Sequence, residues 1–113
     1  MKIKLITGFR DDQYHTIDIS EAHKAYYLFL NPEQRGIFDN GLAIQGKVIQ
    51  SIEPDYHATM NWNKGYKLTA EDYAEINRRG LDSRFRDLMS KAKTIATTQK
   101  ELLSKPMDTN LLN

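Results

Sequence analysis

The chain has 113 residues, 16 lysines and arginines against 15 aspartates and glutamates, a net charge of +1 and no cysteine. Without cysteine, a disulfide scaffold, thiol catalysis and a cysteine-built zinc site are excluded. No apolar run approaches the ~20 residues that span a bilayer, so neither a membrane span nor a signal peptide is expected. A 40% apolar and 10% aromatic composition predicts one folded domain over residues 1–113.

The first half of the chain begins with two alternating runs, residues 2–9 and 14–19, joined by a polar turn. Alternation with period two is typical of strands, so these runs predict a β-hairpin. Ser20 is the expected N-cap of a helix that extends to Leu30, because apolar side chains then recur at helical spacing. Asn31 and Pro32 should end this helix, since the residue before proline avoids the α region.

A second antiparallel unit is expected around Asn40 and Gly41, which lie between the apolar runs 36–39 and 42–44. Asn-Gly is a strong hairpin signal because both residues accept positive φ. Residues 48–52 are β-branched and predict a further strand that ends at Pro54.

The segment from Gly41 to Lys47 also matches the first seven positions of a phosphate-binding loop. That loop needs Ser or Thr next and a helix after it, whereas Val48 follows here and a strand is expected. The two glycines are therefore expected to serve turns.

The second half of the chain is expected to be a long loop over residues 55–67 followed by helices. Thr69 and Asp72 have the spacing of a capping box for a short helix over residues 70–79, which Gly80 should end. Asp82 or Ser83 should cap a longer helix to about residue 104, and Pro106 bars its continuation.

This order of elements predicts an α+β fold. It is a small antiparallel sheet of two hairpin-like units with one packed helix and a C-terminal helical extension. Residues 1–67 form the body with its aromatic loop, residues 68–105 the helical part, and residues 106–113 a frayed tail.

The aromatic loop is the first candidate binding surface. Its large side chains lie among asparagines and a lysine, a composition typical of protein-binding hot spots and able to stack on bases. The alternative is that they cover the core. With two residues of the following helix, the candidate protein-binding residues are Tyr56, Met60, Trp62, Tyr66, Phe85 and Met89.

The long helix is the second candidate surface, because it combines an apolar stripe with basic residues. The stripe is formed by Phe85, Leu88, Met89, Ala92, Ile95, Ala96, Leu102 and Leu103. It can dock on the sheet, on a partner or on a second copy of the chain. Residues 78–105 carry 8 basic and 3 acidic side chains, so a basic face opposite the stripe can instead contact nucleic-acid phosphates. The candidate nucleic-acid-binding residues are Arg78, Arg79, Arg84, Arg86, Lys91 and Lys93.

Catalytic and metal-binding patterns are weak. Glu53, Asp55 and His57 alternate as metal ligands in an extended segment could, but a solvated strand end beside Pro54 is the expected interpretation. No serine lies in a nucleophile elbow. No catalytic residue, metal or cofactor is assigned.

Three phrases, residues 21–30, 40–44 and 54–63, resemble small single-domain proteins of tailed bacteriophages, over roughly the first 80 residues. The resemblance implies a bacterial host cytoplasm or a virion as the setting. It also implies a non-enzymatic accessory protein that binds another protein, including inhibition of a host or defence factor. No residue role is carried over, and nucleic-acid binding through the basic helix is the alternative.

Overall fold

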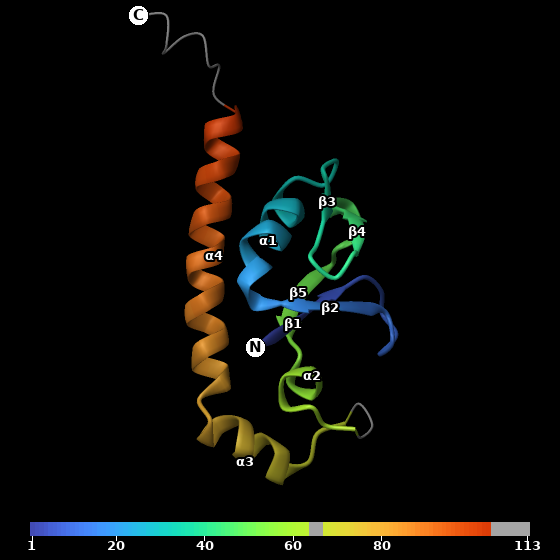
Figure 1. Ribbon diagram of the computed structural model, residues 1–113, viewed down its shortest axis with the longest axis vertical. Helices are drawn as coiled ribbons and strands as arrows, with labels where there is room; N and C mark the ends of the chain where they lie inside the picture. The colour runs from blue at the N-terminus through green and yellow to red at the C-terminus, as the bar shows by residue number, and fades with distance from the viewer. Residues whose placement is uncertain (64–66, 105–113) are drawn as a thin grey trace, which may run out of the picture.

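The structure is a computed structural model that describes residues 1–63 and 67–104, and its architecture is α+β, as predicted (Figure 1). A three-stranded antiparallel sheet has the order β2-β1-β5, and two further strands, β3 and β4, form a separate hairpin. The strands are β1 (Lys2–Ile6), β2 (Tyr14–Asp18), β3 (Arg35–Ile37), β4 (Ala43–Gln45) and β5 (Ser51–Pro54).

The β1–β2 hairpin confirms the first predicted unit, with Ile3 opposite Ile17 on the face that is buried in the core. Strand β1 ends at Ile6, not at Phe9. The reason is a hydrogen bond of 2.9 Å from the Thr7 N–H to the Gln13 carbonyl, which closes the loop early. Phe9 is left 96% exposed on this loop.

The first helix begins differently from the prediction. The carboxylate of Asp18, not Ser20, is the cap, because it accepts from the Ser20 N–H at 3.0 Å. This cap opens a 3-10 turn, η1 (Ile19–Glu21), which continues into α1 (Ala22–Leu30).

The Asn-Gly hairpin is present, but only Gly41 of its turn has a positive φ, 90°. The Gly41 N–H donates to the Phe38 carbonyl and the Phe38 N–H donates to the Leu42 carbonyl, each at 2.8 Å. A loop with one left-handed glycine at its end therefore replaces the expected pair of positive-φ residues.

Gly46, the second glycine of the phosphate-loop pattern, begins a 3-10 turn as expected, and it also allows a close approach of two backbone segments that the pattern did not predict. A Cβ atom at this position would lie 2.0 Å from the Leu28 carbonyl oxygen at the end of α1. The Gly46 N–H donates to the Gln34 carbonyl at 2.8 Å, and a 3-10 turn, η2 (Gly46–Val48), follows.

The strand predicted at residues 48–52 is therefore shifted. Residues 48 and 49 finish the turn of η2, and the strand β5 is Ser51–Pro54, paired with β1 and not with β4. Pro54 is the last residue of the strand, which lies at the edge of the sheet, where proline is tolerated.

The segment expected to be a loop contains a short helix, α2 (Tyr56–Met60). The Asp55 side chain caps it by accepting from the Ala58 N–H at 3.0 Å, and Asn61 ends it with a φ of 57°. Polar caps form this helix without an apolar period, which is why the pattern missed it.

Two further helices follow, α3 (Ala70–Arg78) and α4 (Leu81–Ser104). The capping box of Thr69 and Asp72 is confirmed, and Gly80 has a φ of 65°. The prediction that Asp82 or Ser83 caps the long helix is wrong, because the Gly80 carbonyl already accepts from the Arg84 N–H at 3.0 Å. Pro106 and the predicted tail lie outside the described residues.

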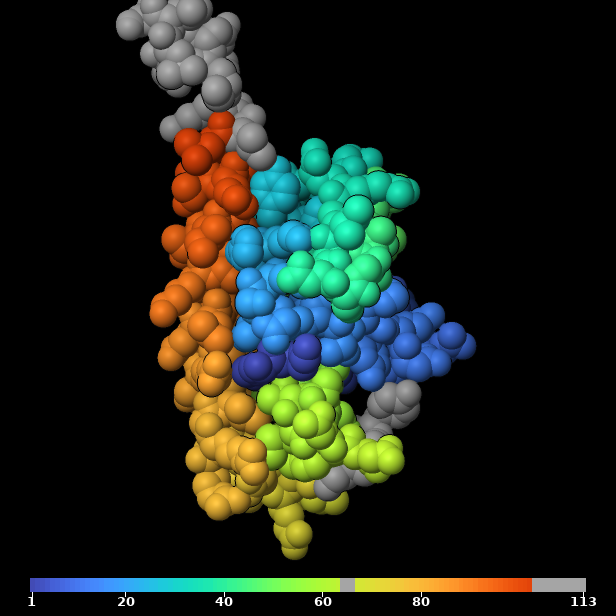
Figure 2. All heavy atoms as spheres, in the orientation of Figure 1, coloured from blue at the N-terminus to red at the C-terminus, as the bar shows by residue number. Residues whose placement is uncertain are grey.

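Helix α4 packs chiefly along α1 rather than on the sheet, as the ribbon and the space-filling view both show (Figures 1 and 2). Met89 and Ala92 of α4 join one buried core with Ala25 and Leu28 of α1 and with Leu5 of the sheet. Small side chains at Ala25 and Ala92 allow the two helices to approach closely. Within the described residues, no helix is both long and apolar enough to cross a membrane.

Candidate functional site

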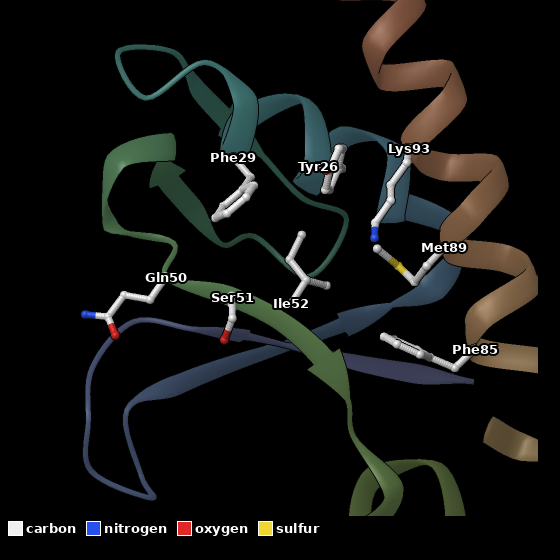
Figure 3. Close-up of a pocket in the computed structure, with 8 residues that line it drawn as sticks. All are labelled: Tyr26, Phe29, Gln50, Ser51, Ile52, Phe85, Met89 and Lys93. Atoms are coloured by element: carbon white, nitrogen blue, oxygen red, sulfur yellow. The ribbon is translucent and has the colours of Figure 1, made fainter.

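The best-defined hollow is a cleft of about 240 Å³ between α1, β5 and α4 (Figure 3). Its wall is largely apolar and aromatic, with a single cation and no carboxylate among the described residues that line it. The lining residues are Tyr26, Phe29, Gln50, Ser51, Ile52, Phe85, Met89 and Lys93. We call it the β5 cleft.

The residues that α1 and α4 contribute to the β5 cleft recur at helical spacing. Tyr26 and Phe29 lie one turn apart on α1, with ring centroids 5.8 Å apart. Phe85, Met89 and Lys93 recur every four residues and so follow one flank of α4.

Phe29 is 37% exposed although its neighbours form the core, so its ring contributes an open apolar surface to the cleft. An exposed aromatic ring beside a concave apolar wall is the usual shape of an anchor site for another molecule.

Lys93 supplies the charge at the β5 cleft. Its ammonium lies 5.5 Å from the centroid of the Tyr26 ring, a cation–π distance, and it points over the cleft in Figure 3. The ring therefore positions this cation at the mouth of the cleft, where it can meet an anionic group of a bound molecule.

A second hollow of about 380 Å³ lies on the other flank of α4, beside the N-terminus. Its charged and titratable lining residues are Asp18, His23, Arg84 and Lys91, and Leu88 and Ile95 supply apolar surface. It is called the basic hollow here. Asp18 partly offsets its cations, and Lys2 pairs with Asp18 at 3.8 Å.

The structure separates the predicted protein-binding residues into two groups. Phe85 and Met89 lie in the β5 cleft, whereas Tyr56, Met60 and Trp62 lie on or just after α2. Tyr66 lies outside the described residues.

Tyr56 and Trp62 have local contacts. The Tyr56 hydroxyl donates to the Asp82 carboxylate in the first turn of α4, and the Trp62 ring meets the His57 ring edge-on with centroids 6.3 Å apart. Burial, followed by this hydrogen bond, raises the pKa of Tyr56 above its ordinary value of 10.0. These contacts show Tyr56 tying α2 to α4.

The basic residues do not share one face, so the expectation of a single basic face opposite the stripe is wrong. Arg78 and Arg79 both pair with Glu75 on α3. These arginines lower the pKa of Glu75. Arg84 and Lys91 line the basic hollow, whereas Lys93 lines the β5 cleft and Arg86 lies near Tyr56.

The stripe of the long helix is partly used inside the molecule. Met89, Ala92 and Ala96 are buried, whereas Ile95 is 47% and Leu102 59% exposed. Contact with α1 therefore occupies the centre of the stripe, and its exposed members lie to one side.

The three residues with metal-like alternation each have a separate local role. Asp55 is buried and accepts from the Thr16 hydroxyl at 2.5 Å as well as capping α2. Glu53 accepts from the Ser51 hydroxyl at 3.1 Å, and His57 contacts Trp62. Within the described residues, no group of three or more potential ligand side chains converges on one point.

Comparison of the chain with models of protein families, with curated proteins and with solved structures found no match. The arrangement of its own residues is therefore the basis for any functional proposal.

Three residues of the cleft, Tyr26, Phe29 and Ile52, were not predicted from the sequence. An available signal was the width of the apolar surface on residues 22–30, which exceeds what one buried helix face requires. Only tertiary packing brings Tyr26 and Phe29 beside Phe85, which is 55 or more positions away from α1 in the chain.

Proposed function

We propose that this chain is a protein-binding accessory protein without catalytic activity, and that the β5 cleft receives an apolar side chain of its partner. The observation that carries the proposal is the open aromatic wall of the cleft, with Phe29 37% exposed beside Tyr26 and Phe85. Aromatic anchors around a preformed apolar cavity supply most of the energy of many protein interfaces.

The polar lining of the β5 cleft supports binding rather than chemistry. Gln50, Ser51 and Lys93 are its polar side chains, and the Ser51 hydroxyl already donates to Glu53. A nucleophilic mechanism needs a base that also faces the bound molecule, and Glu53, which accepts from Ser51, is not among the described residues that line the cleft.

The resemblance to phage proteins suggests the setting of this proposal. In a bacterial cytoplasm or a virion, the partner would be a host or phage protein. Binding in the cleft would inhibit the partner protein if the bound segment is also required for that protein's own activity.

Affinity capture tests the proposal. The tagged chain is used to capture proteins from bacterial cells, with and without phage infection, as wild type and as Phe29→Ala. We expect a captured protein whose recovery falls at least about tenfold with Phe29→Ala, since loss of a hot-spot ring costs that much affinity.

The matched control is Tyr73→Ala, which removes a 57% exposed aromatic ring on α3, outside the cleft. Recovery should be unchanged with this variant. Equal recovery with wild type and Phe29→Ala would overturn the proposed function.

A second candidate function is contact with nucleic-acid phosphates through the basic hollow. It is favoured by Arg84 and Lys91, which lie two turns apart on one flank of α4 with His23 beside them. Binding of single-stranded DNA at low salt should then weaken steeply as salt rises, and the double variant Arg84→Gln, Lys91→Gln should remove about 1.4 units of the salt slope, about 0.7 for each lost contact to a single strand. No binding at low salt would exclude this function.

A further inference from the structure

We infer that the partner inserts an extended segment beside β5 as an additional strand, with an apolar side chain in the β5 cleft and a carboxylate two residues away that pairs with Lys93. This inference rests on the proposed function and specifies the chemistry of the partner. Its elements are an open sheet edge, a cleft above that edge and one positioned cation.

Strand β5 lies at the end of the sheet order β2-β1-β5, with β1 on one side and, within the described residues, no strand on the other. The opposite edge, β2, is partly covered, because the Asn40 side chain donates to the Thr16 carbonyl at 3.0 Å. The open edge of the sheet is therefore that of β5, and an extended peptide can add there.

The register shows which backbone groups face the open edge. The Asp55 N–H donates to the Lys2 carbonyl at 3.0 Å, toward β1, and successive residues of a strand point their backbone groups to opposite edges. Ile52 therefore turns its N–H and its carbonyl to the open edge, and Pro54 turns its carbonyl there. A short added strand can pair with these groups.

The β5 cleft reaches this edge. Ser51 and Ile52 both line it, although consecutive side chains of a strand point to opposite faces of the sheet. Its contact with both residues, together with the place of β5 at the end of the strand order, puts the cleft at the edge of the sheet. Figure 3 shows Ile52 pointing up between the strand and the rings of Tyr26 and Phe29.

An added strand would direct every second side chain to the same face as Ile52, into the β5 cleft. One of these positions meets Phe29, Phe85 and Met89, which favours an apolar side chain. The position two residues along the segment can meet Lys93. Since no carboxylate lines the cleft in the described part of the chain, an Asp or Glu of the partner complements it.

The first test selects random displayed heptapeptides on the purified full chain. We expect enriched peptides with an apolar residue and, two positions away, Asp or Glu. Selection on Lys93→Glu should change the second position to Lys or Arg. Lys91→Glu, which alters the basic hollow on the other flank of α4, is the matched control and should keep the acidic preference.

The second test measures how the best peptide binds. The peptide is synthesised with one N-methyl group at each amide in turn, and its affinity for the wild-type chain is measured. Pairing along one edge predicts losses of about tenfold at alternate amides and little change at those between them.

The outcomes separate this inference from the proposed function. Equal losses at all amides, apolar spacing of three and four residues, or no enriched peptide would overturn strand addition. Capture that still depends on Phe29 would then leave the proposed function standing. A dimer that the peptide dissociates, observed by light scattering, would assign the open edge to a second copy of the chain and overturn the inference.

Discussion

The two flanks of α4 differ in chemistry although they belong to one helix. Among the described residues, the β5 cleft has three aromatic rings and one cation, whereas the basic hollow has Arg84, Lys91 and His23 with a single carboxylate. The difference comes from the helical period, which places residues seven apart on the same flank. Arg84 and Lys91 thus share one flank, and Arg86 and Lys93 lie on the other.

This division changes what the charge of the helix means. Residues 78–105 carry 8 basic and 3 acidic side chains, but Arg78 and Arg79 are paired with Glu75, and Arg84 and Lys91 lie on a different flank from Arg86 and Lys93. A count of charges along a helix therefore overstates the density of any one face. The flanks are better treated as two sites with different partners.

The largest effect should come from Gly46→Ala, which disturbs the packing of η2 against the end of α1, the helix that forms one wall of the β5 cleft. The new Cβ would meet the Leu28 carbonyl oxygen at 2.0 Å, and backbone cannot move away as a side chain can. We expect a loss of about 3 kcal/mol in the free energy of unfolding, measured in urea.

Gly41→Ala is the control for this substitution. It also places alanine at a former glycine, with a φ of 90° but with nothing within 4 Å of the new Cβ. Its cost should be about 1 kcal/mol, from backbone strain alone. Equal losses for the two variants would contradict the close approach of η2 to α1.

The next largest effect should come from a substitution in the contact between α4 and α1, which lies between the two flanks of α4. Ala92 is 5% exposed in the core between α4 and α1, so Ala92→Leu must force the helices apart. We expect a loss of about 2 kcal/mol and weaker peptide binding at the β5 cleft. Thr94→Leu, on the exposed side of the same helix, should change stability by less than about 0.5 kcal/mol. If Ala92→Leu were as stable as wild type, α4 and α1 would have room for a larger side chain between them, and the prediction would be wrong.

Local signals predicted a good part of this fold, and the failures have physical causes. The Thr69–Asp72 capping box and the Asn40–Gly41 hairpin were predictable, because both depend on bonds between near neighbours. The position of β5 was not, because a distant contact of Gly46 with α1 delays the strand by three residues.

The candidate site was predicted only in part. Phe85 and Met89 follow from the helical period, but the period does not show that Tyr26 and Ile52 complete their cleft. Tyr56 is the opposite case: its aromatic ring suggested a binding surface, and its hydroxyl instead bonds to Asp82. Tertiary packing decides which residues far apart in the sequence come into contact, and a local sequence pattern does not predict this.

A smaller effect should come from Tyr56→Phe, which removes the tie between α2 and the first turn of α4 near Arg86. The lost hydrogen bond should cost about 1 kcal/mol at pH 7. The pKa of Tyr56 is raised in the folded chain, so its contribution is complete below pH 10.0 and is lost as the pH rises through the folded value. The difference between wild type and variant should therefore shrink in alkaline urea titrations. Tyr27→Phe, on α1 and away from Tyr56, should have no such pH-dependent cost.

The smallest effect should come from Asp18→Asn, which makes the basic hollow more basic without removing the cap. Asparagine caps helices about as well as aspartate, so the substitution isolates the charge. Hydrogen bonds from Ser20, backbone first, lower the pKa of Asp18 below its ordinary value of 3.8. The carboxylate therefore contributes stability above that pH and loses it as the pH falls through the folded value. We expect the variant to be about 0.5 kcal/mol less stable at pH 7, the size of an exposed charge interaction, and equal to wild type in strong acid. Peptide binding at the β5 cleft should not change, because Asp18 lies on the other flank of α4. A change there would mean that the two flanks are coupled through the helix and are not independent sites.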